Sequence, residues 1–85
     1  MARIVMYCTS DCPYCQDAER LLLHKGVRDL EKIRVDLESG RREEMMRRSG
    51  RRTVPQIWIG ERHVGGCDDL HDLERKGRLD ELLAG

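Results

Sequence analysis

Residues 3–15 read RIVMYCTSDCPYC. The first part, residues 3–8, is a short apolar run with β-branched and aromatic members, and it predicts a strand buried on both faces. Pro13 suits the first position of a helix, where its missing N–H would have no partner in any case. The pair Cys12 and Cys15 therefore falls where a buried strand passes into a helix.

The rest of the chain alternates between strand and helix patterns. Apolar residues alternate with polar ones in the predicted strands and recur at three- and four-residue spacing in the predicted helices. Polar caps and glycine stops mark several helix ends. In chain order, the predicted elements are a strand over 3–8, a helix over 13–25, a strand over 30–37, a helix capped by Ser39 and running to about Arg48, a strand over 55–59, a strand over 62–64, a helix capped by Asp68 or Asp69, and a short helix over 79–83.

This order, β-α-β-α-β-β-α, predicts an α/β fold. A β-α-β unit makes its two strands parallel and covers the sheet with a helix, and the closing hairpin adds antiparallel strands. A chain of 85 residues has the length of one small domain. We therefore expect residues 1–85 to form a single domain with a four-stranded mixed sheet flanked by helices.

The composition argues against several classes of protein. Sixteen Lys and Arg balance sixteen Asp and Glu, so the formal net charge is zero, and only three residues are aromatic. A protein that binds nucleic acid would be expected to be basic and richer in aromatic residues. No stretch approaches the roughly 20 apolar residues that span a bilayer, and no signal-peptide pattern is visible. We expect a cytoplasmic protein with no nucleic-acid or membrane partner.

The zero net charge hides two segments of opposite sign. Residues 41–52, RREEMMRRSGRR, carry six Arg and two Glu, whereas residues 66–85 carry three basic and six acidic side chains. This pattern predicts two patches that face different partners or different ends of one ligand. Such patches would suit a zwitterionic ligand.

The position of Cys12 and Cys15 predicts redox chemistry. The start of a helix presents unpaired N–H groups and the positive end of the helix dipole, so it stabilises a thiolate at Cys12. A thiolate there can attack a disulfide, and Cys15, one turn later, can resolve the mixed disulfide that forms. In a reducing compartment a Cys-x-x-Cys pair beside a β-α-β pattern favours a redox motif over a structural disulfide.

Other uses of the cysteines are less well supported. Cys8, Cys12 and Cys15 have a spacing that can also hold an iron–sulfur cluster, and the four cysteines together could form a zinc site. Cys8 lies at the end of a strand pattern, where a buried core residue is expected. The three histidines have no mutual spacing that suggests a metal, so surface or packing roles are expected for them, and no metal site is predicted.

With these motifs in place, the chain resembles the glutaredoxins, in particular the small bacterial class with a Cys-Pro-Tyr-Cys active site. The resemblance covers nearly all of the chain. Three ordered segments carry it, namely residues 7–15 (YCTSDCPYC), 52–60 (RTVPQIWIG) and 65–70 (GGCDDL). The resemblance implies a thioredoxin fold and thiol–disulfide exchange driven by glutathione as the reducing co-substrate, with no tightly bound cofactor.

The resemblance also implies roles for particular residues. Cys12 would be the nucleophile and Cys15 the resolving cysteine. Pro55 matches a proline that is cis in the family. The residues that would bind glutathione are Tyr14, Arg52, Thr53, Val54, Pro55, Gly66, Cys67, Asp68 and Asp69. The resemblance implies, in addition, that the basic segment 41–52 and the acidic segment 66–85 lie on opposite sides of the cysteine pair.

One departure from the family pattern concerns Thr9, which stands where members often carry a lysine that helps to bind a glutathione carboxylate. Arg41 or Arg42 is expected to substitute for that charge. Trp58 replaces a commoner phenylalanine within an apolar strand, which is a mild change.

The sequence therefore predicts a glutathione-dependent oxidoreductase. It would reduce protein disulfides through Cys12 and Cys15, and protein–glutathione mixed disulfides through Cys12 alone. Two alternatives stay open: a thioredoxin-like reductant recharged by a flavoenzyme reductase, and an iron–sulfur carrier. Disulfide-containing or glutathionylated proteins, with ribonucleotide reductase among the compatible targets, are the expected partners of a monomer.

Overall fold

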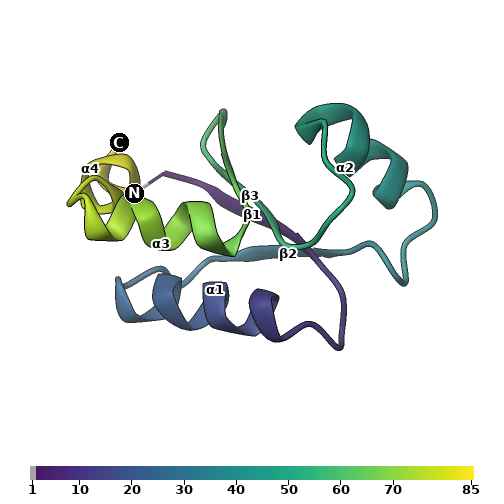
Figure 1. Cartoon of the computed structure of the whole chain (residues 1–85), viewed down its shortest axis with the longest axis horizontal. Helices are drawn as coiled ribbons and strands as arrows, with labels where there is room; N and C mark the ends of the chain where they lie inside the picture. The colour runs from purple at the N-terminus through teal and green to yellow at the C-terminus, as the bar shows by residue number, and fades with distance from the viewer. Residues whose placement is uncertain (1) are drawn as a thin grey trace.

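The computed structural model describes residues 2–85, which form four strands and four helices (Figure 1). In chain order these are β1 (Ile4–Cys8), α1 (Pro13–His24), β2 (Glu31–Arg34), α2 (Arg41–Ser49), β3 (Gln56–Ile59), β4 (Arg62–Gly65), α3 (Cys67–Arg75) and α4 (Leu79–Ala84). The strands stand in the order β2-β1-β3-β4. β1 and β2 are parallel, and the other two neighbouring pairs are antiparallel. The predicted four-stranded mixed sheet flanked by helices is confirmed.

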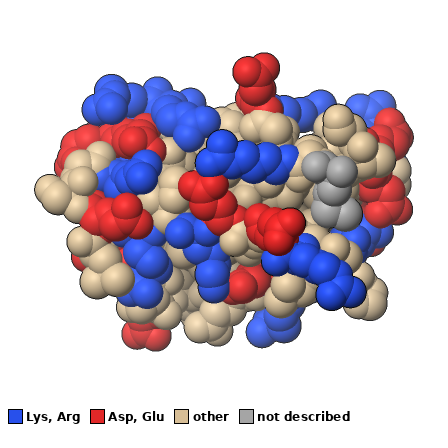
Figure 2. Space-filling view, turned by 180° about the vertical axis from the view of Figure 1, so that it is seen from behind, with Lys and Arg blue, Asp and Glu red and all other residues tan. Residues whose placement is uncertain are grey.

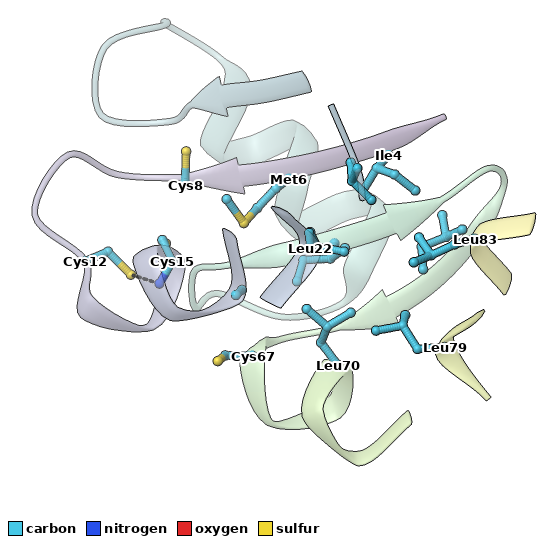
Figure 3. Packing of buried hydrophobic residues seen from close by; sticks show 14 residues of the cluster. Ile4, Met6, Cys8, Cys12, Cys15, Leu22, Cys67, Leu70, Leu79 and Leu83 are labelled. Atoms are coloured by element: carbon cyan, nitrogen blue, oxygen red, sulfur yellow. Dashed lines mark hydrogen bonds between the residues drawn. The ribbon is translucent and has the colours of Figure 1, made fainter. Parts of the chain in front are cut away.

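The sheet has a buried cluster on each face. α1 and α3 pack against each other on one face, while α2 lies on the other (Figure 1). The larger cluster, on the α1 and α3 face, reaches from the cysteines at one end to α4 at the other (Figure 3). Alternate residues of β1 serve the two clusters, because successive side chains of a strand point to opposite faces. β1 is therefore buried on both faces, as its apolar run predicts.

Tyr7 ties α2 to the sheet in the smaller cluster. Its side chain is fully buried, and its hydroxyl donates to the Glu44 carboxylate and accepts from the Arg48 guanidinium at 2.7 Å. Burial, and then the bond to Glu44, raise the pKa of Tyr7. Arg48 also lies over the Trp58 ring, with its Cζ atom 4.4 Å from the ring centroid. Polar contacts thus join α2 to the sheet in addition to the burial of Met45.

We expect Tyr7→Phe to lower the free energy of unfolding by about 1–2 kcal/mol, because Glu44 and Arg48 lose a partly buried hydrogen-bond partner. Urea denaturation measures the change. Tyr14→Phe is the matched control, since Tyr14 is 65% exposed and its hydroxyl can bond to water in either state. Equal losses for the two variants would show that the buried hydroxyl stabilises nothing.

The end of β2 and the start of α2 differ from the predicted element boundaries. The strand ends at Arg34 rather than continuing to Leu37, whose side chain is 72% exposed. The chain turns here because Asp36 accepts two hydrogen bonds from Arg34 and one from the backbone N–H of Ser10. Ser39 does not cap α2: Gly40 is the N-cap residue, at φ +82° and with no side-chain cap.

The start of α3 also differs from the prediction. Neither Asp68 nor Asp69 is its cap, because the helix begins at Cys67 with Gly66 as the N-cap residue. Asp69 instead reaches back and accepts a hydrogen bond from the backbone N–H of Gly66 at 2.9 Å. This is half of a capping box, in which an acidic residue at the third helical position satisfies the N-cap N–H.

None of the helices in the described part of the chain has the length and apolar character needed to cross a membrane.

Candidate active site

Cys12 is the N-cap residue of α1, directly before Pro13. Its Sγ atom accepts a hydrogen bond from the backbone N–H of Cys15 at 3.1 Å, drawn as a dashed line in Figure 3. Cys12 Sγ therefore lies at the positive end of the α1 dipole, against backbone N–H groups that have no partner within the helix. The predicted position of Cys12 at a helix start is confirmed, and Pro13 occupies the first turn as predicted.

Cys15 lies inside the larger cluster and is 4% exposed. Burial, and then its hydrogen-bond contact with Cys12, raise the pKa of Cys15 to about 12. Cys15 is therefore a neutral thiol at neutral pH. Cys8 is also buried, as predicted, and burial raises the pKa of its thiol. Of these three cysteines, Cys12 alone caps a helix, and its sulfur alone accepts a hydrogen bond from the backbone N–H of Cys15.

The loop that precedes β3 faces Cys12. The Val54–Pro55 peptide bond is cis, and the Val54 carbonyl oxygen lies 3.9 Å from Cys12 Sγ. The buried side chain of Gln56 holds this loop, since its amide donates to the Thr53 carbonyl oxygen at 3.0 Å. The backbone of Val54 lies outside the sheet and beside Cys12 Sγ, where an extended peptide could pair with it.

A groove of about 390 Å³ runs along this loop to the start of α3. Most of the residues predicted to bind glutathione line it together. They are Tyr14, Thr53, Val54, Pro55, Gly66, Cys67, Asp68 and Asp69. Arg52 is exposed and is not among the lining residues, whereas its neighbour Arg51 is.

Arg51 joins the two oppositely charged segments of the sequence. Its guanidinium donates to Asp69 Oδ2 at 2.8 Å, and this bond lowers the pKa of Asp69. The prediction of two opposed patches is therefore wrong at the site, because the basic and acidic segments meet in an ion pair. Basic and acidic side chains are also intermingled on the face of the molecule shown in Figure 2.

Arg41 and Arg42, the residues expected to replace the family lysine at the position of Thr9, lie away from the groove. Arg41 forms ion pairs with Glu38 and Glu44, and Arg42 borders a separate hollow near the start of α2. Neither arginine lines the groove. Thr9 does not line it either and instead borders a hollow beside Cys8 and Cys15.

Sequence reasoning missed two groups at the site: Gln56, which is buried behind the proline loop, and Arg51, which lines the groove. Gln56 could have been found, because a polar residue inside an apolar strand pattern needs buried hydrogen-bond partners. Arg51 carried no such signal, since the sequence does not tell which of several consecutive arginines turns toward α3.

These features define a class: thiol–disulfide oxidoreductases, with a cysteine pair at the start of a helix and a cis-proline loop across from it. Similarity to known proteins gives the family. A family model described as Glutaredoxin matches residues 4–64. The chain is 56% identical over 84 residues to a glutaredoxin of Pseudomonas aeruginosa, covering 99% of each chain.

Two further relatives agree with this assignment. Glutaredoxin 3 of Escherichia coli is 49% identical over 83 residues, covering 98% of this chain and 99% of the relative. The crystal structure of a buckwheat glutaredoxin–glutathione complex superposes with a TM-score of 0.90 at 31% identity, covering 98% of this chain and 77% of that one. The chain belongs to the glutaredoxin family and has the thioredoxin fold. Its activity is that of a glutathione-dependent thiol oxidoreductase, with glutathione as a substrate.

Proposed function

We propose that Cys12 and Cys15 divide the reaction between them. The Cys12 thiolate attacks one sulfur of a target disulfide, so that a Cys12–target bond forms and the other target sulfur leaves and takes a proton. Cys15 then loses its proton and attacks Cys12 Sγ, which releases the reduced target and leaves a Cys12–Cys15 disulfide. The observation that carries this proposal is the 3.1 Å hydrogen bond from the Cys15 N–H to Cys12 Sγ at the start of α1.

Glutathione restores the dithiol in two steps. One glutathione thiolate attacks the Cys12 sulfur and forms a mixed disulfide with it, freeing Cys15. A second glutathione attacks the glutathione sulfur of that mixed disulfide, releasing oxidised glutathione and the Cys12 thiolate. A protein–glutathione mixed disulfide needs Cys12 alone, because Cys12 takes the glutathionyl group and the target leaves as a thiol.

The groove offers a partner for each part of glutathione. The cysteinyl part pairs with the Val54 backbone, next to Cys12 Sγ, while Tyr14 flanks the glutathione sulfur. The γ-glutamyl carboxylate meets the N–H groups at the start of α3, and the exposed Asp68 carboxylate receives the ammonium.

The remaining carboxylate of glutathione belongs to its glycine end. We assign it to Arg51, which lines the groove, while Arg52 stays a prediction from the family resemblance. Asp69 shapes the groove instead of binding ligand directly, because its carboxylate already holds Arg51 and the Gly66 N–H.

Several properties stay proposals from the sequence. They are a single domain over residues 1–85, a monomer without a resident cofactor, a cytoplasmic location, and targets among disulfide-containing or glutathionylated proteins, such as ribonucleotide reductase.

An electron-source assay tests the proposed function. With a small disulfide substrate, we expect turnover when glutathione, glutathione reductase and NADPH are supplied. We expect at most about a tenth of that rate with thioredoxin reductase and NADPH, because the contacts proposed for the groove select a zwitterionic tripeptide. Comparable or faster turnover with thioredoxin reductase would instead support the thioredoxin-like alternative.

A further inference from the structure

Three side chains that could bind a metal meet between α1 and α3. Cys67 is the first residue of α3, and His71 follows one turn later on the same helix. Residues four apart on a helix share a face. Asp17 comes from α1, which packs against α3. The Cys67 sulfur, one His71 ring nitrogen and one Asp17 carboxylate oxygen all lie within 4.8 Å of one another.

The His71 ring has an unsatisfied atom facing this cluster. Its Nε2 atom is buried and has no hydrogen-bond partner within the described chain. It lies 3.3 Å from Asp17 Oδ2, close enough for an ion pair but without the geometry of a hydrogen bond. A buried polar atom without a partner is uncommon, and an unseen ligand is one of its standard causes.

The observed distances fit the edges of a zinc coordination tetrahedron. Zinc–ligand distances of about 2.3 Å for sulfur and about 2.0–2.2 Å for nitrogen and oxygen require donors about 3.4–3.6 Å apart. Asp17 Oδ2 lies 3.5 Å from Cys67 Sγ and 3.3 Å from His71 Nε2. Two edges are therefore already formed, and the third needs the sulfur and the nitrogen to approach by at most about 1.4 Å.

We propose that Asp17, Cys67 and His71 form a zinc-binding site, separate from the Cys12–Cys15 pair. One thiolate, one imidazole and one carboxylate are the donor types that zinc accepts, and three protein ligands leave a fourth position for water. The sequence predicts no metal here, because Asp17 lies 50 residues from Cys67 and only the packing of α1 on α3 joins them.

Zinc binding changes the state of one ligand. In the free protein the Cys67 thiol donates to Asp17. Burial, and then the bond to Asp17, raise the pKa of Cys67 to about 11, so the sulfur is protonated at neutral pH. When a zinc–sulfur bond forms, the S–H bond breaks and the proton passes to the solvent. Each zinc bound therefore releases one proton from Cys67.

The test uses the full chain with Cys12→Ser and Cys15→Ser, so that the redox pair does not bind the metal. Zinc is titrated into this parent in competition with a chromophoric chelator. We expect one zinc per chain, at a stoichiometry independent of protein concentration. Cys67→Ser, His71→Gln and Asp17→Asn should each weaken binding by at least about 100-fold, since each removes a ligand and even outer-shell changes cost about 10–100-fold.

Controls separate the site from unspecific binding and from misfolding. His24→Gln and Asp11→Asn change exposed residues of the same types and should leave the affinity within about twofold of the parent. Circular dichroism verifies that every variant is folded. With cobalt in place of zinc, the parent should show the intense visible bands of a tetrahedral ion and a thiolate charge-transfer band, and Cys67→Ser should lose the latter.

Any of three results would overturn the proposal. They are a folded parent that retains no zinc against the chelator, equal affinity in the parent and in all three ligand variants, and one zinc per two chains. The last result would place the ligands on different molecules. None of these results bears on the redox function, because the parent lacks the redox pair.

Discussion

Cys12→Ser is expected to abolish turnover of both protein disulfides and protein–glutathione mixed disulfides, lowering kcat/KM by about three orders of magnitude or more. A serine hydroxyl in the same place does not ionise at neutral pH and cannot form a disulfide. The N–H of Cys15 and the start of α1 would still be present, but no sulfur would receive their stabilisation. Initial rates with each substrate type, with glutathione reductase recycling the glutathione, measure the loss.

Cys15→Ser is the matched variant, one helical turn away. It should lose the reduction of protein disulfides that needs a resolving thiol, yet keep the mixed-disulfide reaction within about the same order of magnitude. The difference follows from the structure because Cys12 caps the helix and accepts the Cys15 N–H, whereas burial and the contact with Cys12 raise the pKa of the Cys15 thiol. Residual turnover of both substrates by Cys12→Ser would refute the assignment of the nucleophile, and loss of both in folded Cys15→Ser would refute the division of roles.

Gly65→Ala should be the most damaging small change near the groove, lowering the free energy of unfolding by about 2–4 kcal/mol. Gly65 has φ +116°, a conformation that side chains with a Cβ rarely adopt. An added Cβ would lie 2.3 Å from Asp69 Oδ2, so the carboxylate would have to move. That movement breaks its bonds to the Gly66 N–H and to Arg51. Urea denaturation measures the stability, and KM for glutathione should rise because the start of α3 shifts.

Gly77→Ala provides the control for backbone conformation. Gly77 also has a positive φ, +71°, but an added Cβ there would meet no atom within 4 Å. This variant should lose only about 1 kcal/mol and leave KM for glutathione unchanged. If Gly65→Ala lost no more than Gly77→Ala, the contact with Asp69 would not matter for stability.

Much of the fold follows from local patterns. β1, α1 and the hairpin of β3 and β4 lie close to their predicted positions, because a continuous apolar run, a proline at the first helical position and a two-residue turn each specify a conformation within a few residues. The end of β2 was predicted wrongly because a longer-range contact takes part in forming the turn that follows it. β2 ends early because Arg34 and the Ser10 N–H hold Asp36 in a turn.

The candidate site divides in the same way. Cys12 and Cys15 could be found from the sequence, since their spacing and the helix start are local. The choice of Arg51 over Arg52 could not, because it depends on which side chain meets Asp69 across 18 residues of chain. The prediction that the basic and acidic patches are separate was wrong for the same reason. The net charge of a segment does not tell which other segment it contacts in the folded chain.

The sequence by itself determined the position of the cysteine pair, the strand and helix that present it, and the order of elements that makes the fold. These features depend on residues a few positions apart, whose backbone preferences act within one turn or one strand. Only the tertiary structure decided that Val54 faces Cys12, that Arg51 closes on Asp69, and that Asp17 meets Cys67 and His71. Those contacts join distant segments, and they form because burying the two faces of the sheet brings the helix ends and the proline loop together.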